Sequence, residues 1–290
     1  MPIVFGAVAP HGFPIIPDIS QNADGALRTR DAMLELGRRF DAANVEVVVV
    51  AGPHGVRVND FIMLADCGRA AGALTWEGRT VEMNVPLDMP LTRQIAQSAR
   101  DRQVPVALAG YAASNPESSV YPLDWGIMTP LWFCGHAHNQ AGHGYVLADK
   151  PAADAGPTTV IAQPSRTLPR EQLLGFGRAV AEAAAIDGRR VAFIASCDWA
   201  HRHAENGPYG FHPDAKRMDD EVVAAIQDNQ PARLIALDDE YISNAAIDGL
   251  WQLLILAGVQ EVVPLAVDLL SYEAPSYYGM LVATYAPQGA

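Results

Sequence analysis

Three histidines each follow an apolar stretch that is typical of a buried strand. His11 comes after the segment GAVAP, His54 after VVVVAGP and His201 after FIASCDWA. In open α/β sheets ligands bind beyond the carboxyl ends of the strands, so we expect the three imidazoles to approach one crevice. Proline and glycine flank His11 and His54, which favours sharp turns that expose the side chains. For any one of these histidines alone, a simple role as a loop cap or hydrogen-bond partner stays open.

Such a convergence would suit a metal ion. Two imidazoles and one carboxylate are the ligand set of non-haem Fe(II) oxygenases, and zinc hydrolases also combine histidine with carboxylate ligands at an open site. Among the carboxylates after His201, the runs 219–221 and 238–240 are typical of solvated helix edges or turns. Asp248 differs because it precedes the apolar segment LWQLLILAG. There it is either functional or a helix N-terminal acid that the helix dipole favours.

A second cluster also has spacing that resembles a metal site. It consists of Cys134, His136, His138 and His143, in a glycine-rich stretch without the second cysteine pair of a zinc site. An irregular loop is the favoured interpretation, with a substrate pocket or an incidental metal as alternatives.

Strands and helices alternate along the chain. Apolar runs predict strands, and amphipathic patterns predict helices. The expected strands are 2–9, 45–50, 104–109, 158–162, 190–195 and 278–285, and the expected helices 23–43, 91–102, 170–186, 213–228 and 244–257. The stretches 110–126 and 134–157, rich in glycine, proline and serine, are expected to be loops around 130–133. The pattern predicts an α/β fold, a single domain over 1–290 whose central mixed sheet has helices on both faces.

Composition narrows the class of partner. The chain has 290 residues, 50% of them hydrophobic, which is enough to bury a sizeable core. Its net charge of −13 and lack of a basic run argue against nucleic acid and anionic membranes as partners. No apolar run is long enough to cross a bilayer, and the amino terminus lacks a secretory signal. Three widely spaced cysteines indicate reduced thiols, so we expect a cytoplasmic enzyme with a small-molecule substrate.

Five short motifs occur in order along nearly the whole chain: AVAPHG, VVVVAGPHG, PLDWGIMTPLWF, FIASCDWAHRH and DEYISNAAIDGLWQLLILAG. Together they resemble the class III extradiol ring-cleavage dioxygenases, the superfamily of the protocatechuate 4,5-dioxygenase β subunit. Memo-like proteins and plant-type DOPA dioxygenases belong to it as well. The resemblance implies that His11 and His54 are ligands of an Fe(II) ion and that His201 is an acid–base histidine. The third ligand varies in the superfamily; the segment 246–250 matches its place, which implies Asp248, with Glu240 as the fallback.

The chain departs from the family pattern at one position. Many members carry a histidine where this chain has Trp125, so we expect Trp125 to line the pocket of an aromatic substrate. His203 is a further candidate for substrate binding, and both His203 and Asp198 are candidates for positioning His201. The resemblance implies an extradiol dioxygenase that opens a catechol-like or dihydroxylated heteroaromatic ring with O2, acting alone or as a homo-oligomer. The alternatives are a Memo-like metal-binding redox or interaction protein and a metal-dependent hydrolase.

Overall fold

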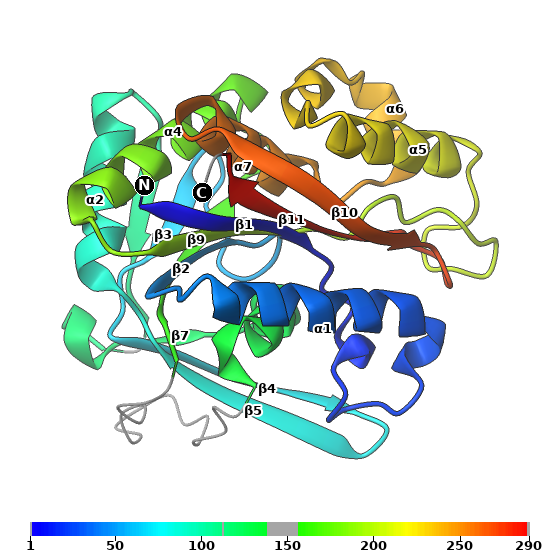
Figure 1. Ribbon diagram of the computed structural model, residues 1–290, viewed down its shortest axis with the longest axis horizontal. Helices are drawn as coiled ribbons and strands as arrows, with labels where there is room; N and C mark the ends of the chain where they lie inside the picture. The colour runs from blue at the N-terminus through cyan, green and yellow to red at the C-terminus, as the bar shows by residue number, and fades with distance from the viewer. Residues whose placement is uncertain (1, 112, 138–155, 289–290) are drawn as a thin grey trace.

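The computed structural model describes residues 2–111, 113–137 and 156–288, and its centre is an eight-stranded mixed sheet (Figure 1). Four parallel strands form the middle, in the order β1 (Ile3–Ala9), β9 (Val191–Ser196), β2 (Val47–Ala51) and β8 (Thr158–Pro164). Next to β1 lie the antiparallel strands β11 (Met280–Pro287) and β10 (Leu265–Glu273). Next to β8 lie β3 (Ile62–Ala65), which is antiparallel to it, and β6 (Val106–Ala109).

The valine run of β2 explains why this strand lies in the interior. Val47 and Val49 belong to the core on one face of the sheet, whereas Val48 and Val50 belong to the core on the other. Because side chains alternate along a strand, a continuous apolar run needs cover on both faces. One face is covered by α2 (Met89–Asp101), α4 (Arg170–Asp187), α5 (Asp214–Gln227) and α7 (Leu250–Val262), and the other by α1 (Leu27–Ala42) and α3 (Trp125–Leu131) (Figure 1). This confirms the predicted mixed sheet, in a single domain, with helices on both faces.

A second, three-stranded sheet packs beside α3 and has no counterpart in the sequence prediction. Its order is β5 (Arg79–Pro86), β4 (Arg69–Trp76) and β7 (Val120–Pro122). The turn between β4 and β5 is Glu77-Gly78, both at positive φ (49° and 77°), as a two-residue hairpin turn demands. Strand β4, RAAGALTW, is rich in alanine and has only one β-branched residue, Thr75, so its sequence gives a weak strand signal.

The prediction of one helix over 244–257 is wrong. A short helix, α6 (Asp239–Ala245), ends at Ala246, which has a left-handed backbone conformation (φ 51°), and α7 begins only at Leu250. Gly249 lies so close to β9 that a Cβ there would be 2.5 Å from the Cβ of Cys197. This close approach holds the 246–249 connection against the end of the central sheet and brings Asp248 to the strand ends.

The prediction that 110–126 and 134–157 are loops around 130–133 is also wrong in part, because residues 125–136 are helical. Asp124 caps α3 by accepting the N–H of Gly126, and a π-helical segment, η4 (Trp132–His136), continues it. The remaining short helices are 3₁₀ turns: η1 (Phe13–Ile15), η2 (Ala23–Gly25), η3 (Pro116–Ser118) and η5 (Pro231–Ala236). None of the helices in the described ranges is long and apolar enough to span a membrane.

Candidate metal centre

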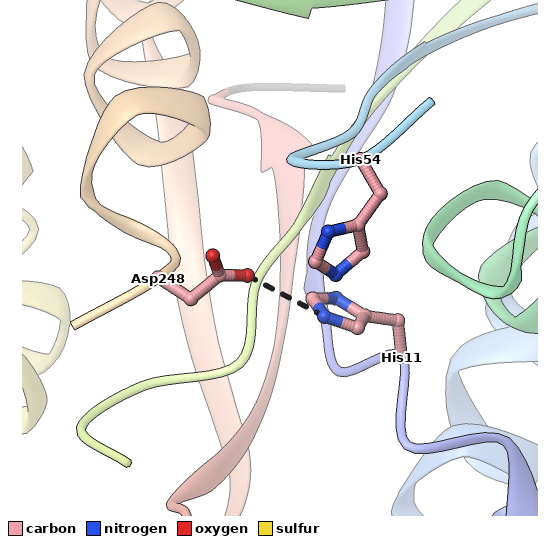
Figure 2. Close-up of side chains that lie close together, drawn as sticks. All are labelled: His11, His54 and Asp248. Carbon is pink, nitrogen blue, oxygen red and sulfur yellow. Dashed lines mark ion pairs between the residues drawn. The ribbon is translucent and has the colours of Figure 1, made fainter. Parts of the chain in front are cut away.

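His11, His54 and Asp248 lie together at the carboxyl end of the central sheet. Their ligand atoms all lie within 4.8 Å of one another, and Figure 2 shows the three side chains converging from separate segments. His11 follows β1, His54 follows β2, and Asp248 comes from the connection before α7. The two imidazole rings are nearly perpendicular, with centroids 5.1 Å apart. The strand ends thus bring the two histidines to one point, as expected, while their role as ligands stays a prediction.

Pro130 determines, through Ser196, which ring nitrogen of His11 carries the proton. Proline has no N–H, so the carbonyl of Gly126, four residues earlier in α3, has no helical donor. The hydroxyl of Ser196 donates to that carbonyl instead. Since its only proton is used there, Ser196 Oγ accepts a hydrogen bond at its other contact, 3.2 Å from His11 Nδ1. Nδ1 of His11 therefore carries the proton, and Nε2 presents a lone pair to the site.

Two buried carboxylates face that lone pair. His11 Nε2 lies 3.2 Å from Oδ2 of Asp198 and 3.4 Å from Oδ2 of Asp248. Burial lowers the pKa of His11 well below its ordinary value and raises the pKa of Asp198 and Asp248. Among the described residues, Oδ2 of Asp248 has no hydrogen-bond donor. Because several lone pairs converge on one buried point, a bound cation fits this donor set.

A glycine-dependent turn places His54. Gly55 has φ +91°, and the space that a Cβ would occupy is filled by Gln163 and Asp124, so the turn requires glycine. The ring of Trp125 lies against the imidazole of His54 at 4.4 Å between centroids, tilted by 35°. Burial lowers the pKa of His54, which keeps the imidazole neutral and able to bind a metal.

Arg166 holds the other oxygen of Asp248. It lies two residues after the end of β8, its guanidinium donates to Asp248 Oδ1, and its Cζ lies 4.8 Å above the ring of Trp251. This contact assigns the two oxygens of Asp248 different partners: Oδ1 faces Arg166, and Oδ2 faces His11 (the dashed line in Figure 2). The arrangement favours binding of a metal through one carboxylate oxygen.

His201 is oriented through its Nδ1. This atom lies 2.7 Å from the carbonyl of Trp199 and 3.2 Å from that of Ala246, so Nδ1 carries a proton and Nε2 a lone pair. The ring stacks on Tyr278, with centroids 5.4 Å apart and an interplanar angle of 13°. Burial lowers the pKa of His201, so the imidazole is neutral and ready to take up a proton. These features suit a general base.

A cavity of about 340 Å³ opens beside the three candidate ligands. His11, His54 and His201 line it together with Asp198 and Trp125. Its remaining side chains are mainly aromatic and come from four separate segments: Phe13, Trp76, Tyr209, and the adjacent Tyr277 and Tyr278. A volume of this size suits a ligand of one aromatic ring.

Two other predicted residues lie elsewhere. His203 is absent from the cavity lining; its Nε2 lies 2.8 Å from Oδ2 of Asp219, a fully buried residue that also accepts the hydroxyl of Tyr272 at 2.7 Å. Glu240, the fallback ligand, is exposed in the first turn of α6. Neither residue belongs to the group formed by the three candidate ligands.

The cysteine–histidine cluster is only partly described. Cys134 and His136 are buried in η4, which packs against α1, and burial raises the pKa of the Cys134 thiol. His138 and His143 lie outside the described residues. Within the described ranges, the possible metal-binding group is the one formed by the two strand-end histidines and Asp248.

Sequence reasoning missed several residues of the site. Asp198 was considered only as a partner of His201, although it follows the buried strand β9 in the same way that the histidines follow theirs. Arg166 follows β8, the fourth parallel strand, so the same strand-end rule would have found it. The aromatic residues come from turns whose relative position has no local signal in the sequence.

The comparisons with known proteins bear on the whole chain. A family model described as "Catalytic LigB subunit of aromatic ring-opening dioxygenase" matches residues 6–282. Protein CA_C1420 of Clostridium acetobutylicum is 23% identical over 266 residues, which cover 91% of this chain and 53% of that protein, so the chain spans about half the length of this curated relative. The crystal structure of the uncharacterized protein JW3007 from Escherichia coli K12 has the same fold, with a TM-score of 0.56 and 13% identity over 97% of this chain and 99% of that one. The chain belongs to the family of the catalytic LigB subunit of aromatic ring-opening dioxygenases.

Proposed function

We propose that the protein is a non-haem Fe(II)-dependent extradiol dioxygenase that opens a catechol-like or dihydroxylated heteroaromatic ring with both atoms of O2. One observation carries the proposal: two neutral imidazoles and one carboxylate with an unpartnered oxygen converge within 4.8 Å beside a cavity lined by aromatic residues. Two histidines and a carboxylate on one side of an open position are the ligand set of ferrous oxygenases. Membership of the ring-opening dioxygenase family supports the same activity.

His11, His54 and Asp248 would hold the ferrous ion. When bound, Fe(II) supplies the redox chemistry that lets a closed-shell catechol react with dioxygen. The chain keeps its two imidazoles neutral through burial, and it keeps Nε2 of His11 free of a proton through the contact of Nδ1 with Ser196. Arg166 occupies Oδ1 of Asp248 and leaves Oδ2 directed to the ion.

His201 is the group that we assign to proton transfer. The carbonyl of Trp199 fixes the proton on its Nδ1, so Nε2 can accept a proton from a hydroxyl of the bound ring and later return it. Its stacking on Tyr278 holds the imidazole plane at the cavity wall. The lowered pKa keeps the accepting form populated near neutral pH.

The aromatic walls would hold the substrate ring. Trp125 lies against His54 in the cavity lining, which also includes Tyr209, Tyr277 and Tyr278, and such aromatic faces suit stacking of a flat ring. The same side chains exclude water from the buried end, where His11 is only 2% exposed. The presence of Trp125 in the cavity lining supports its proposed role in binding the substrate ring.

Anaerobic loading with Fe(II), followed by oxygen uptake with a panel of catechols, tests the proposal. We expect stoichiometric oxygen consumption and a coloured ring-fission product, with neither in zinc-loaded protein. His54→Ala provides the matched control, since it removes one imidazole from the edge of the site and should abolish iron retention. Tight metal binding without oxygen consumption across the panel would contradict the proposal and favour the Memo-like alternative.

A further inference from the structure

The candidate substrate cavity has a buried end and an exposed rim with different chemistry. The buried end holds His11 and Asp198, which are 2% and 4% exposed. The rim holds Asp24 and Tyr209, which are both exposed. A catechol whose two hydroxyls reach the metal centre at the buried end would therefore carry any further substituent toward this rim.

The charged side chains that line the cavity are acidic. Asp24 and Asp198 line it, and none of the described lining residues is a lysine or an arginine. Burial first, and then the negative charges of Asp198 and Asp24, raise the pKa of the Tyr278 phenol, so both carboxylates act on the same wall. A substituent with a negative charge would be repelled here, and a positive one attracted.

The two arginines near the cavity, Arg166 and Arg30, already have other hydrogen-bond partners. Arg166 donates to Asp248 and stacks on Trp251, and it lines a separate cavity of about 640 Å³ between the start of α4 and η5. Arg30, a buried residue of α1, donates to the carbonyls of Pro14, Ile15, Ser20 and Gln21 at 2.7 to 2.9 Å. Neither guanidinium is available to a carboxylate in the substrate cavity.

The aromatic rim suits a cation in a second way. Phe13 and Trp76 meet edge to face at 5.6 Å, and Tyr277 lies 6.4 Å from Tyr209 across the rim. The faces of tryptophan and tyrosine rings attract ammonium groups, with a larger effect where water is partly excluded. Aromatic faces and a carboxylate together form the usual chemistry of an amine-binding pocket.

Asp24 is held in place for such a contact. It lies in η2 with φ +50°, between Ala23 (φ +55°) and Gly25 (φ +86°), and the side chain of Asn22 accepts its N–H at 3.1 Å. A left-handed backbone at two successive residues other than glycine is uncommon and needs support from the surroundings. Arg30 donates to the carbonyls of Ser20 and Gln21 and so anchors the segment that leads into this turn. Among the described residues, the Asp24 carboxylate has no ion-pair or hydrogen-bond partner.

We propose that this cavity selects a catechol whose side arm ends in a protonated amine over one whose arm ends in a carboxylate, and that Asp24 sets this preference. The inference rests on the proposed ring-opening function, because it places the diol at the metal centre. It concerns the far end of the substrate, which the metal ligands and His201 do not contact. Asp24 is accordingly a specificity residue with no part in the chemistry.

Binding of three catechols with arms of matched length tests the preference. The ligands are 3,4-dihydroxyphenethylamine, 4-ethylcatechol and 3-(3,4-dihydroxyphenyl)propionate, titrated by calorimetry into the Fe(II)-loaded protein without oxygen at pH 7. We expect the amine to bind roughly tenfold more tightly than the propionate, with the ethyl compound between them. Asparagine also tolerates a left-handed backbone, so Asp24→Asn should keep the turn. In this variant the ratio of the affinity for the amine to that for the propionate should fall to about two- or threefold.

Asp18→Asn is the matched control, because it removes an exposed acid from the same β1–α1 connection without touching the cavity. It changes the net charge of the chain by the same amount, so it separates a local contact from the attraction of the whole acidic surface. Its binding ratio should equal that of the unmodified protein. A propionate that binds as tightly as the amine, or an Asp24→Asn ratio that equals the unmodified one, would overturn the proposal.

Oxygen uptake, measured separately with the same ligands, distinguishes this inference from the function on which it rests. Ring opening combined with a preference for the propionate overturns the amine selection alone. Preferential binding of the amine without ring opening of any ligand overturns the dioxygenase function alone. Failure of all three catechols to bind overturns both.

Discussion

The Nε2 atom of His11 lies 3.4 Å from the Oδ2 atom of Asp248, and both side chains are buried. Nδ1 of His11 already carries the imidazole proton, and Arg166 faces the other oxygen of Asp248. A cation bound between Nε2 of His11 and Oδ2 of Asp248 would be attracted by the lone pairs of both. The packing of the fold thus holds two candidate ligand atoms at a spacing that a metal ion can bridge.

The first prediction concerns the third ligand. Asp248→Ala should reduce the iron content of protein purified without oxygen from about one equivalent to a small fraction, because two imidazoles alone hold Fe(II) weakly. Glu240→Gln is the control, since Glu240 is the alternative ligand and is exposed on α6. It should keep its full iron content. Elemental analysis measures both, and loss of iron from the Glu240 variant instead would reverse the assignment.

The second prediction separates proton transfer from metal binding. His201→Ala should retain iron and lose roughly 10²- to 10⁴-fold in kcat, the usual contribution of general acid–base catalysis. His203→Gln should leave KM within a few-fold, because His203 contacts Asp219 and does not line the cavity. Steady-state oxygen uptake on iron-loaded proteins gives both values. A normal kcat in the His201 variant would remove it from the mechanism.

The same histidine predicts the direction of a pH effect. Burial lowers the pKa of His201 from its ordinary value near 6.5, so the neutral, proton-accepting form persists to more acidic pH. In a profile of kcat/KM against pH, the fall on the acidic side should therefore lie below about pH 6.5. A midpoint above that value would show that another group controls the acidic limb.

The strand-end histidines could be found from the sequence because each follows a strong local signal. The run VEVVVV can only be a strand covered on both faces, and β1 and β9, its parallel companions, have similar apolar runs. Parallel neighbours end at the same edge of a sheet, so the proximity of His11, His54 and His201 follows from strand order alone.

Other parts of the site depend on contacts between distant segments. The pattern of residues 244–257 does not show that Ala246 adopts a left-handed conformation, because the break is imposed by packing of Gly249 on β9. The position of Trp76 likewise depends on a hairpin whose first strand is rich in alanine. Asp248 was therefore placed by resemblance, whereas Asp24 and the aromatic wall residues other than Trp125 could not be placed at all.

The third prediction concerns the support of the His201 loop by Asp219. Oδ1 of this fully buried residue accepts the N–H of Ala200 at 2.9 Å, and Oδ2 lies 2.8 Å from Nε2 of His203. Asp219→Ala leaves those donors without partners and should lower the free energy of unfolding by about 3 kcal/mol or more. Asp220→Ala, in the next position, removes only an exposed ion pair with Lys216 and should change the free energy of unfolding by less than about 0.5 kcal/mol.

Chemical denaturation measures both free energies, and turnover adds a second test. Because Asp219 holds the backbone directly before His201, the Asp219 variant should also lose kcat under conditions where it is still folded. The Asp220 variant should not. Equal stability of the two variants would show that the contacts of Asp219 have no structural role.

The fourth prediction is a pH dependence of stability. Burial raises the pKa of Asp124 to about 6, above the value near 3.9 of an unfolded chain. Between these values the folded state binds more protons than the unfolded one, so this group's contribution to stability decreases as pH rises. Asp124→Asn still accepts the N–H of Gly126 but no longer titrates. Between pH 4 and pH 7, the free energy of unfolding of Asp124→Asn should rise by up to roughly 3 kcal/mol relative to that of the unmodified protein.

Urea denaturation of the metal-free proteins at the two pH values measures this difference without interference from metal release. Asp101→Asn, which changes an exposed acid at the end of α2, serves as the control and should follow the unmodified protein. If the free energy of unfolding of Asp124→Asn changes between the two pH values by the same amount as that of the unmodified protein, the carboxyl of Asp124 does not titrate in this range.

The fifth prediction is that Arg166 controls metal affinity without touching the metal. Arg166→Met removes the donor to Oδ1 of Asp248, so the carboxylate can rotate and lose its orientation toward His11. Residues that orient a metal ligand typically contribute 10- to 100-fold to affinity, and a weakening of Fe(II) binding in that range is expected. Arg178→Met breaks a partly exposed pair with Glu261, which joins α4 to α7 without contacting the candidate ligands, and should leave affinity unchanged.

The charge of Arg166 adds a second readout, which is the pH dependence of metal binding. Its positive charge lowers the pKa of His11, His54 and His201, so its removal lets those pKa values rise. Protons then compete with iron at higher pH, and the fall in metal affinity on acidification should begin at a higher pH in Arg166→Met than in the unmodified protein. Arg166→Lys keeps the charge but not the fixed fork of donors, so it should restore the pH midpoint more fully than the affinity. If Arg166→Met binds iron as tightly as Arg178→Met at every pH, the arginine only fills space beside Trp251.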